Sequence, residues 1–111
     1  MIQREESENC NTYNEWVETM IVTSGDTRKI ENILGLVGEA GEVAEKIKKQ
    51  IRDETKVSPS DIAREIGDVL FYATALAHIY GYTLHDIMQM NIAKLEDRKN
   101  RNKIKGVGDD R

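Results

Sequence analysis

The chain has 111 residues, a formal net charge of −4 at pH 7 and a single proline. This length suits one domain with its own core, so residues 1–111 are predicted to form a single domain with a polar tail over residues 100–111. The negative charge argues against a nucleic-acid-binding protein. The one cysteine, Cys10, excludes an intrachain disulfide and favours a cytoplasmic location. The longest apolar stretch, VLFYATALAHIYGY, is too short for a membrane span of about 20 residues, so no membrane contact is expected.

Apolar residues recur at helical spacing along the chain, which predicts an all-α fold. A first helix is predicted from about residue 9 to about residue 23, and its apolar face consists of Tyr13, Trp16, Val17, Met20 and Ile21. A second helix is predicted to begin at Asp26 or Thr27, either of which can cap it, and to end before residue 53. Its apolar stripe consists of Ile33, Leu36, Ala40, Val43, Ala44, Ile47 and Ile51.

Capping residues predict where the next two helices begin. Ser58 suits an N-cap, Pro59 the first helical position and Asp61 the third, so a third helix is predicted from here to Gly81. Thr83 is then predicted to cap a fourth helix, with Asp86 as its capping partner. Four helices joined by short loops predict a four-helix bundle or a pair of helical hairpins.

The two middle helices each carry an acidic pair beside the apolar stripe. Glu39 and Glu42 are three residues apart, as are Glu65 and Asp68, so each pair projects from one side of its helix. If the helices pack antiparallel through these faces, the four carboxylates converge on one site. Four clustered carboxylates repel one another unless a cation lies among them.

Oxygen ligands favour Mg²⁺, with Mn²⁺ as the alternative. A di-iron bundle would need Glu-x-x-His pairs, and no Glu in the chain is followed by His three residues later. The competing interpretation is a solvated helix face, in which Glu42 pairs with Lys46 and Glu45 with Lys49.

Glycines surround these acids. Each glycine inside a helix costs about 0.5–1 kcal/mol relative to alanine, so several of them require a reason. We expect them to leave room for a bulky ligand or a close backbone near the acids, and they are Gly35, Gly38, Gly41 and Gly67.

The segment GLVGEAGEVAEKIKK followed by EIGDVLFYATALA resembles the signature of the MazG-like nucleoside triphosphate pyrophosphohydrolases, which are all-α proteins. The family pattern is Glu-x-x-Glu, a spacer and Glu-x-x-Asp. The resemblance extends over nearly the whole chain. It implies Mg²⁺-dependent cleavage of a nucleoside triphosphate, ribo or deoxy, between the α and β phosphates. It also implies a homodimer or homotetramer, often with sites built from more than one subunit.

The resemblance also implies contacts beyond the metal. The last helix of the family supplies an Asn and basic side chains to the phosphates, which carries over to Asn91, Lys94 and Arg98; an ordinary polar helix face is the alternative. A base needs a flat apolar surface, and we expect Tyr13 and Trp16 to provide it, with a role in the core as the alternative.

A different class of function is also compatible with the sequence. In a non-enzymatic helical interaction module, the acids would be surface residues and the basic stretch near the C-terminus, KLEDRKNRNKIK, would dock a partner. Magnesium-dependent turnover distinguishes the two classes.

Overall fold

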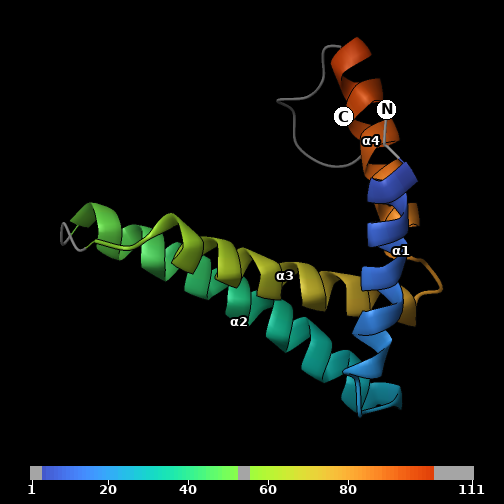
Figure 1. Ribbon diagram of the computed structural model, residues 1–111, viewed down its shortest axis with the longest axis horizontal. Coiled ribbons are helices and arrows are strands. Elements are labelled where there is room, and N and C mark those ends of the chain that lie inside the picture. Colours follow the sequence, from blue (N-terminus) through green and yellow to red (C-terminus); the bar gives the residue numbers. More distant parts are fainter. Residues whose placement is uncertain (1–3, 53–55, 102–111) are drawn as a thin grey trace.

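The computed structural model describes residues 4–52 and 56–101, with side chains from residue 9 onward, and this part of the chain contains helices and no strand. The four helices are α1 (Arg4–Thr19), α2 (Gly25–Arg52), α3 (Pro59–Ile79) and α4 (Leu84–Asn100) (Figure 1). The predicted all-α class is confirmed. The tail residues 102–111 lie outside the described residues. No helix in the described ranges combines the length and hydropathy needed to cross a bilayer.

The first helix is displaced from its predicted position. It begins at Arg4 and ends at Thr19, whereas the apolar spacing predicted about residues 9 to 23. The prediction of its end was wrong because the β-branched stretch from Ile21 to Thr23 has low helix propensity. Gly25 then takes a positive φ of 60° as α2 begins, a conformation that glycine adopts without strain.

The predicted caps of α3 and α4 are present. Ser58 Oγ accepts a hydrogen bond from the Asp61 backbone N–H at 3.2 Å. Thr83 and Asp86 form a reciprocal capping box, and the hydrogen bond from the Thr83 backbone N–H holds the pKa of Asp86 below its usual value. α3 ends at Ile79, just before the expected Gly81.

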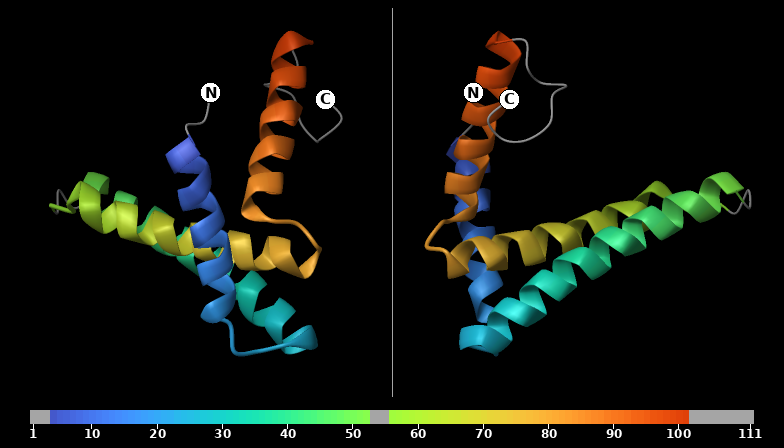
Figure 2. Two further views of the ribbon diagram at one scale, coloured as in Figure 1. Left: turned by 45° about the vertical axis from the view of Figure 1, so that its right-hand side comes forward. Right: turned by 180° about the vertical axis from the view of Figure 1, so that it is seen from behind.

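The helices form an antiparallel hairpin crossed at one end by a second pair. α2 and α3 lie side by side as a long arm, while α1 and α4 stand across its open end (Figures 1 and 2). The α2 and α3 ribbons are closest near their connecting turn and diverge toward α1 (Figure 2, right). This divergence places the residues between α2 and α3 in a wedge that narrows toward the turn.

A polar network joins the four helices where they cross. The carboxylate of Glu18 contacts His78 Nδ1 and accepts a hydrogen bond from Arg28 Nη2 at 2.6 Å. His78 Nε2 lies 2.6 Å from Asn14 Oδ1, which also accepts the Leu84 N–H at 2.8 Å. The hydrogen bond from Arg28 and the contact with His78 hold the pKa of Glu18 below its usual value, although partial burial opposes this. These contacts tie α1 to the start of α2, the end of α3 and the start of α4.

Much of the apolar surface of α2 is not covered within one chain. Among the described residues, the buried hydrophobic side chains are Val17 and Ala75. Leu36 and Val43 of the predicted α2 stripe are partly buried, whereas Leu34 and Val37 are 65% and 64% exposed. The outer face of α2 is therefore an apolar stripe that a single copy of the chain leaves open.

Gly35→Ala is expected to destabilise the fold. A Cβ at position 35 would lie 2.4 Å from the Tyr72 ring, and over-packing of this kind costs about 1–3 kcal/mol. Gly38→Ala is the matched control, because a Cβ there meets nothing within 4 Å and gains about 0.5–1 kcal/mol of helix propensity. Urea unfolding measures both; equal effects of the two substitutions would contradict the packing of Tyr72 on Gly35.

Candidate metal centre

Carboxylates from two helices meet on the α2–α3 arm. Oxygen atoms of Glu39, Glu65 and Asp68 all lie within 4.8 Å of one another. Glu65 and Asp68 share a face of α3 because they are three residues apart, and the antiparallel packing of α2 brings Glu39 opposite them. Three of the four acids predicted to converge are therefore together in the structure.

Glu42 lies outside this group of three. Its side chain is exposed, although its charge contributes to the raised pKa of Glu39. Glu42 is thus near the group without sharing its closest contacts, and its role as a ligand stays a prediction.

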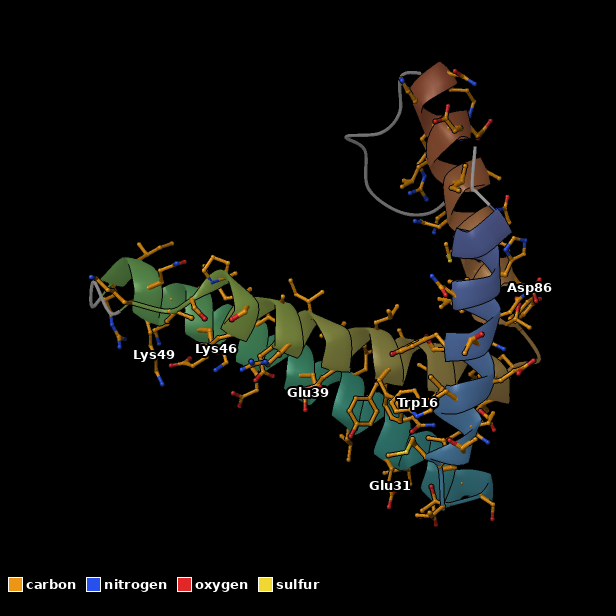
Figure 3. All side chains as sticks on the ribbon, viewed as in Figure 1. Trp16, Glu31, Glu39, Lys46, Lys49 and Asp86 are labelled. Carbon is orange, nitrogen blue, oxygen red and sulfur yellow. The ribbon has the colours of Figure 1, made fainter. Side chains whose placement is uncertain are left out.

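The group of three carries an electrostatic conflict. The pKa of Glu39 is raised chiefly by its hydrogen bond with Glu65, then by desolvation and by the charges of Asp68, Glu65 and Glu42. Lys46 Nζ lies 3.9 Å from Glu65 Oε1, on the side of Glu39 toward the hairpin turn (Figure 3). The positive charge of this lysine offsets the negative charge of Glu65, at one edge of the group of three.

The ligand set fits a hard divalent cation. Two oxygens bound to one Mg²⁺, each about 2.1 Å from the ion, lie at most about 4.2 Å apart. The carboxylate oxygens lie within 4.8 Å of one another, so small side-chain rotations bring them to binding distance. Carboxylate oxygens alone suit Mg²⁺ or Mn²⁺ better than zinc or copper. Glu39, Glu65 and Asp68 are the residues that would hold the ion.

The glycines near the acids fall into two groups. At Gly38, Gly41 and Gly67 an added Cβ would meet nothing within 4 Å, so these three positions face open space, and a role for them beside a ligand stays a prediction. Gly35 differs, because it lies directly under the Tyr72 ring. The expectation that Gly35 makes room for a ligand or a backbone was therefore wrong: it makes room for an aromatic side chain of α3.

An aromatic row leads away from the acids toward α1. Ring centroids are 5.7 Å apart for Tyr13 and Trp16, 5.9 Å for Trp16 and Phe71, and 5.3 Å for Phe71 and Tyr72. Partial burial raises the pKa of Tyr13, and the charge of Asp68 raises it further. At the other end of the row, the Tyr72 ring lies over Gly35 of α2, four residues before Glu39 in the sequence.

Trp16 is only partly buried within one chain, and its contact with a base stays a prediction. Trp16 is 46% exposed, so it is not a core residue of a single chain. Phe71 and Tyr72, which the sequence analysis did not select, follow Asp68 by three and four residues. That helical spacing was the available signal, because it places both rings on the same side of α3 as the acid.

The residues predicted to bind phosphate lie elsewhere in one chain. Asn91 and Lys94 are exposed on α4 and line an 820 Å³ cavity with Leu70 of α3. At about 100° per residue, Leu70 is on nearly the opposite side of α3 from Asp68. Arg98 is only 3% exposed. One copy of the chain therefore does not bring these residues to the carboxylates, and their phosphate contacts stay a prediction.

Glu39→Gln is expected to flatten the pH dependence of stability in the metal-free protein. Because the pKa of Glu39 is raised above its ordinary 4.5, the folded wild type loses stability as the pH rises through the raised value. The glutamine does not ionise, so this loss is absent.

The same substitution is expected to reduce the rise in melting temperature on adding Mg²⁺ or Mn²⁺ at pH 7, since a ligand stabilises the state that binds it. Differential scanning fluorimetry measures both effects. Glu45→Gln is the control, because Glu45 pairs with Lys48 at 4.0 Å outside the group of three. Identical behaviour of the two variants would contradict a metal centre at Glu39.

Comparisons with known proteins place the chain in a family. Residues 28–102 match the MazG nucleotide pyrophosphohydrolase domain, a range that contains the carboxylates, Phe71 and Tyr72. The chain is also similar to the Gene 37 protein of Mycobacterium phage L5, with 42% identity over 96 residues that cover 79% of this chain and 84% of the phage protein. No solved structure matches. The chain belongs to the MazG nucleotide pyrophosphohydrolase family.

Proposed function

We propose that the protein is a Mg²⁺-dependent nucleoside triphosphate pyrophosphohydrolase. It hydrolyses a ribo- or deoxynucleoside triphosphate between the α and β phosphates and releases the monophosphate and pyrophosphate, which suits a role in removing unwanted nucleotides. The observation that supports this most strongly is the convergence of Glu39, Glu65 and Asp68 inside the matched MazG domain.

In this proposal the four carboxylates have different roles. Bound Mg²⁺ supplies charge neutralisation at the phosphates and activation of a water molecule. Glu39, Glu65 and Asp68 hold the ion through their oxygens. Glu42, one turn from Glu39 and outside the group of three, completes the ligand set or accepts the proton of the attacking water.

The active form in this proposal contains more than one copy of the chain, as a homodimer or homotetramer. The exposed stripe on α2, formed by Ile30, Leu34 and Val37, would be costly to leave in water. Asn91 and Lys94, which are exposed on α4, would then contact the phosphates bound to another copy, whereas Arg98 would first have to leave its buried position.

Turnover is the direct test of the proposed activity. Pyrophosphate release from a panel of ribo- and deoxynucleoside triphosphates is expected with Mg²⁺ and none with excess EDTA. Glu39→Gln, Asp68→Asn and Glu42→Gln are each expected to lower kcat by about 100-fold or more, because electrostatic stabilisation of a developing charge is worth that much.

Glu45→Gln is the matched control for these variants and is expected to keep wild-type turnover. Circular dichroism checks that each variant is folded. Absence of turnover on every triphosphate, together with no change in melting temperature on adding Mg²⁺ and nucleotide, would instead favour the non-enzymatic interaction module.

A charged residue placed in the apolar stripe of α2 tests whether the chain self-associates through it. Val37→Asp is expected to convert the oligomer to a monomer in sedimentation-velocity ultracentrifugation, because a carboxylate buried in an apolar interface is costly. Val22→Asp is the control, since Val22 is also exposed but lies outside the helices. A wild-type chain that sediments as a monomer at micromolar concentration would contradict the proposed oligomer.

A further inference from the structure

One lysine of α2 lies on the side of the helix that packs against α3. Lys46 is partly buried, whereas Lys48 and Lys49, within one turn of it, are exposed. Lys46 follows Glu39 by seven residues, so the two share a helix face and lie about 10 Å apart along the axis. Figure 3 shows this order along the arm, from Glu39 to Lys46 and then to Lys49 near the turn.

The partner of Lys46 lies on the other helix. Helical spacing offers Glu42, four residues earlier, yet Lys46 Nζ lies 3.9 Å from Glu65 Oε1 of α3. Glu65 is also the hydrogen-bond partner of Glu39. One carboxylate of the group of three therefore contacts a second carboxylate and an ammonium at the same time.

Two further ion pairs of this arm are of a different kind. Lys48 pairs with Glu45 at 4.0 Å, and Arg64 pairs with Asp61 at 3.4 Å. Each of these pairs joins residues three positions apart on one helix, and none of the four residues belongs to the group of three. A metal ion bound at the carboxylates has no reason to disturb them. Lys46, in contrast, contacts a residue that would hold the ion.

A divalent cation and the Lys46 ammonium are attracted to the same carboxylate and repel each other. Coulomb repulsion falls only with the first power of distance, so a positive charge 3.9 Å from an oxygen of Glu65 lowers the affinity of the group for a cation. The Lys46 side chain is 33% exposed, so water and salt weaken this repulsion without removing it. The site therefore carries a competing cation within the chain itself.

We propose that Lys46 is a built-in counter-ion that offsets Glu65 in the metal-free protein and lowers the affinity of the carboxylates for the divalent cation. The proposal rests on the proposed function and adds a control on how readily the metal centre fills. The protein then requires a higher concentration of free Mg²⁺ than its carboxylates alone would need. Lys46 acts through Glu65 and is a positioning residue.

Metal titration of the nucleotide-free protein tests this directly. Mn²⁺ is titrated into wild-type and Lys46→Gln protein at low ionic strength, and its affinity is measured by isothermal titration calorimetry. Lys46→Gln is expected to bind Mn²⁺ at least about threefold more tightly, because the repelling charge is gone. Lys46→Arg keeps the charge and is expected to stay within about twofold of the wild type. An affinity of Lys46→Gln equal to or below that of the wild type overturns the proposal.

Lys48→Gln is the matched control for the loss of charge. It also removes one positive charge and one ion pair from α2, but its partner is Glu45. It is expected to leave the Mn²⁺ affinity within about twofold of the wild-type value at moderate ionic strength. Circular dichroism checks that each variant is folded. An equal gain in affinity from Lys46→Gln and Lys48→Gln would reduce the effect to net charge and overturn the role of Lys46.

Salt gives a readout that a merely structural role of Lys46 would not change. The difference in Mn²⁺ affinity between Lys46→Gln and the wild type is expected to shrink in about 0.3 M KCl, because salt screens partly exposed charges. A difference that does not depend on salt would indicate altered packing and would overturn the proposal.

The outcomes separate this inference from the proposed function. If the wild type binds Mn²⁺ and hydrolyses triphosphates while Lys46→Gln binds the ion no more tightly, this inference is wrong and the activity stands. If the wild type binds Mn²⁺ but hydrolyses nothing, the activity is wrong, and the titration still decides the role of Lys46. If the wild type binds no Mn²⁺, the metal centre and the counter-ion are both overturned.

Discussion

The packing of α2 against α3 is the constraint on which the rest of the structure depends. Glu39 meets Glu65 and Asp68 only because the two helices have a fixed register, and no interaction within one helix could bring these oxygens together. The Tyr72 ring seated on Gly35 is a close contact that holds this register. A side chain at position 35 would force the ring to move, and the carboxylates would then lose their alignment.

Paired and unpaired polar groups lie in different parts of the helix assembly. At the crossing of the helices, Glu18, Arg28 and His78 form polar contacts in which opposite charges are paired. Along the arm, carboxylates face one another, and nearer to α1 the buried Asn32 Nδ2 has no hydrogen-bond partner among the residues that the structure describes. Both arrangements are destabilising in an empty protein. Such exceptions to ordinary packing cluster at functional sites.

Local signals in the sequence were sufficient to predict where α3 and α4 begin. The caps at Ser58 and Thr83 act within one turn, so their side chains alone define where α3 and α4 begin. The end of α1 was misplaced because Met20 and Ile21 continue the apolar spacing of the helix, while the β-branched stretch that follows ends it. The spacing of apolar residues shows which side chains share a helix face, and it does not show the low helix propensity of β-branched residues.

The candidate site was less accessible to sequence reasoning. Spacing indicated that Glu39 and Asp68 belong to acidic pairs on neighbouring helices, but it did not show that Glu42 would lie outside the closest group. The separation of Lys94 from the acids depends on how α4 crosses α3, which is a tertiary property.

The central claim is that Glu39, Glu65 and Asp68 hold one divalent cation at the phosphates of a nucleotide. A crystal structure with Mn²⁺ and a non-hydrolysable triphosphate, with the metal located by anomalous scattering, tests this most directly. The account predicts a manganese peak bonded to oxygens of all three residues and to the phosphate chain. A peak bound elsewhere, with these carboxylates turned to solvent in every copy, would contradict it.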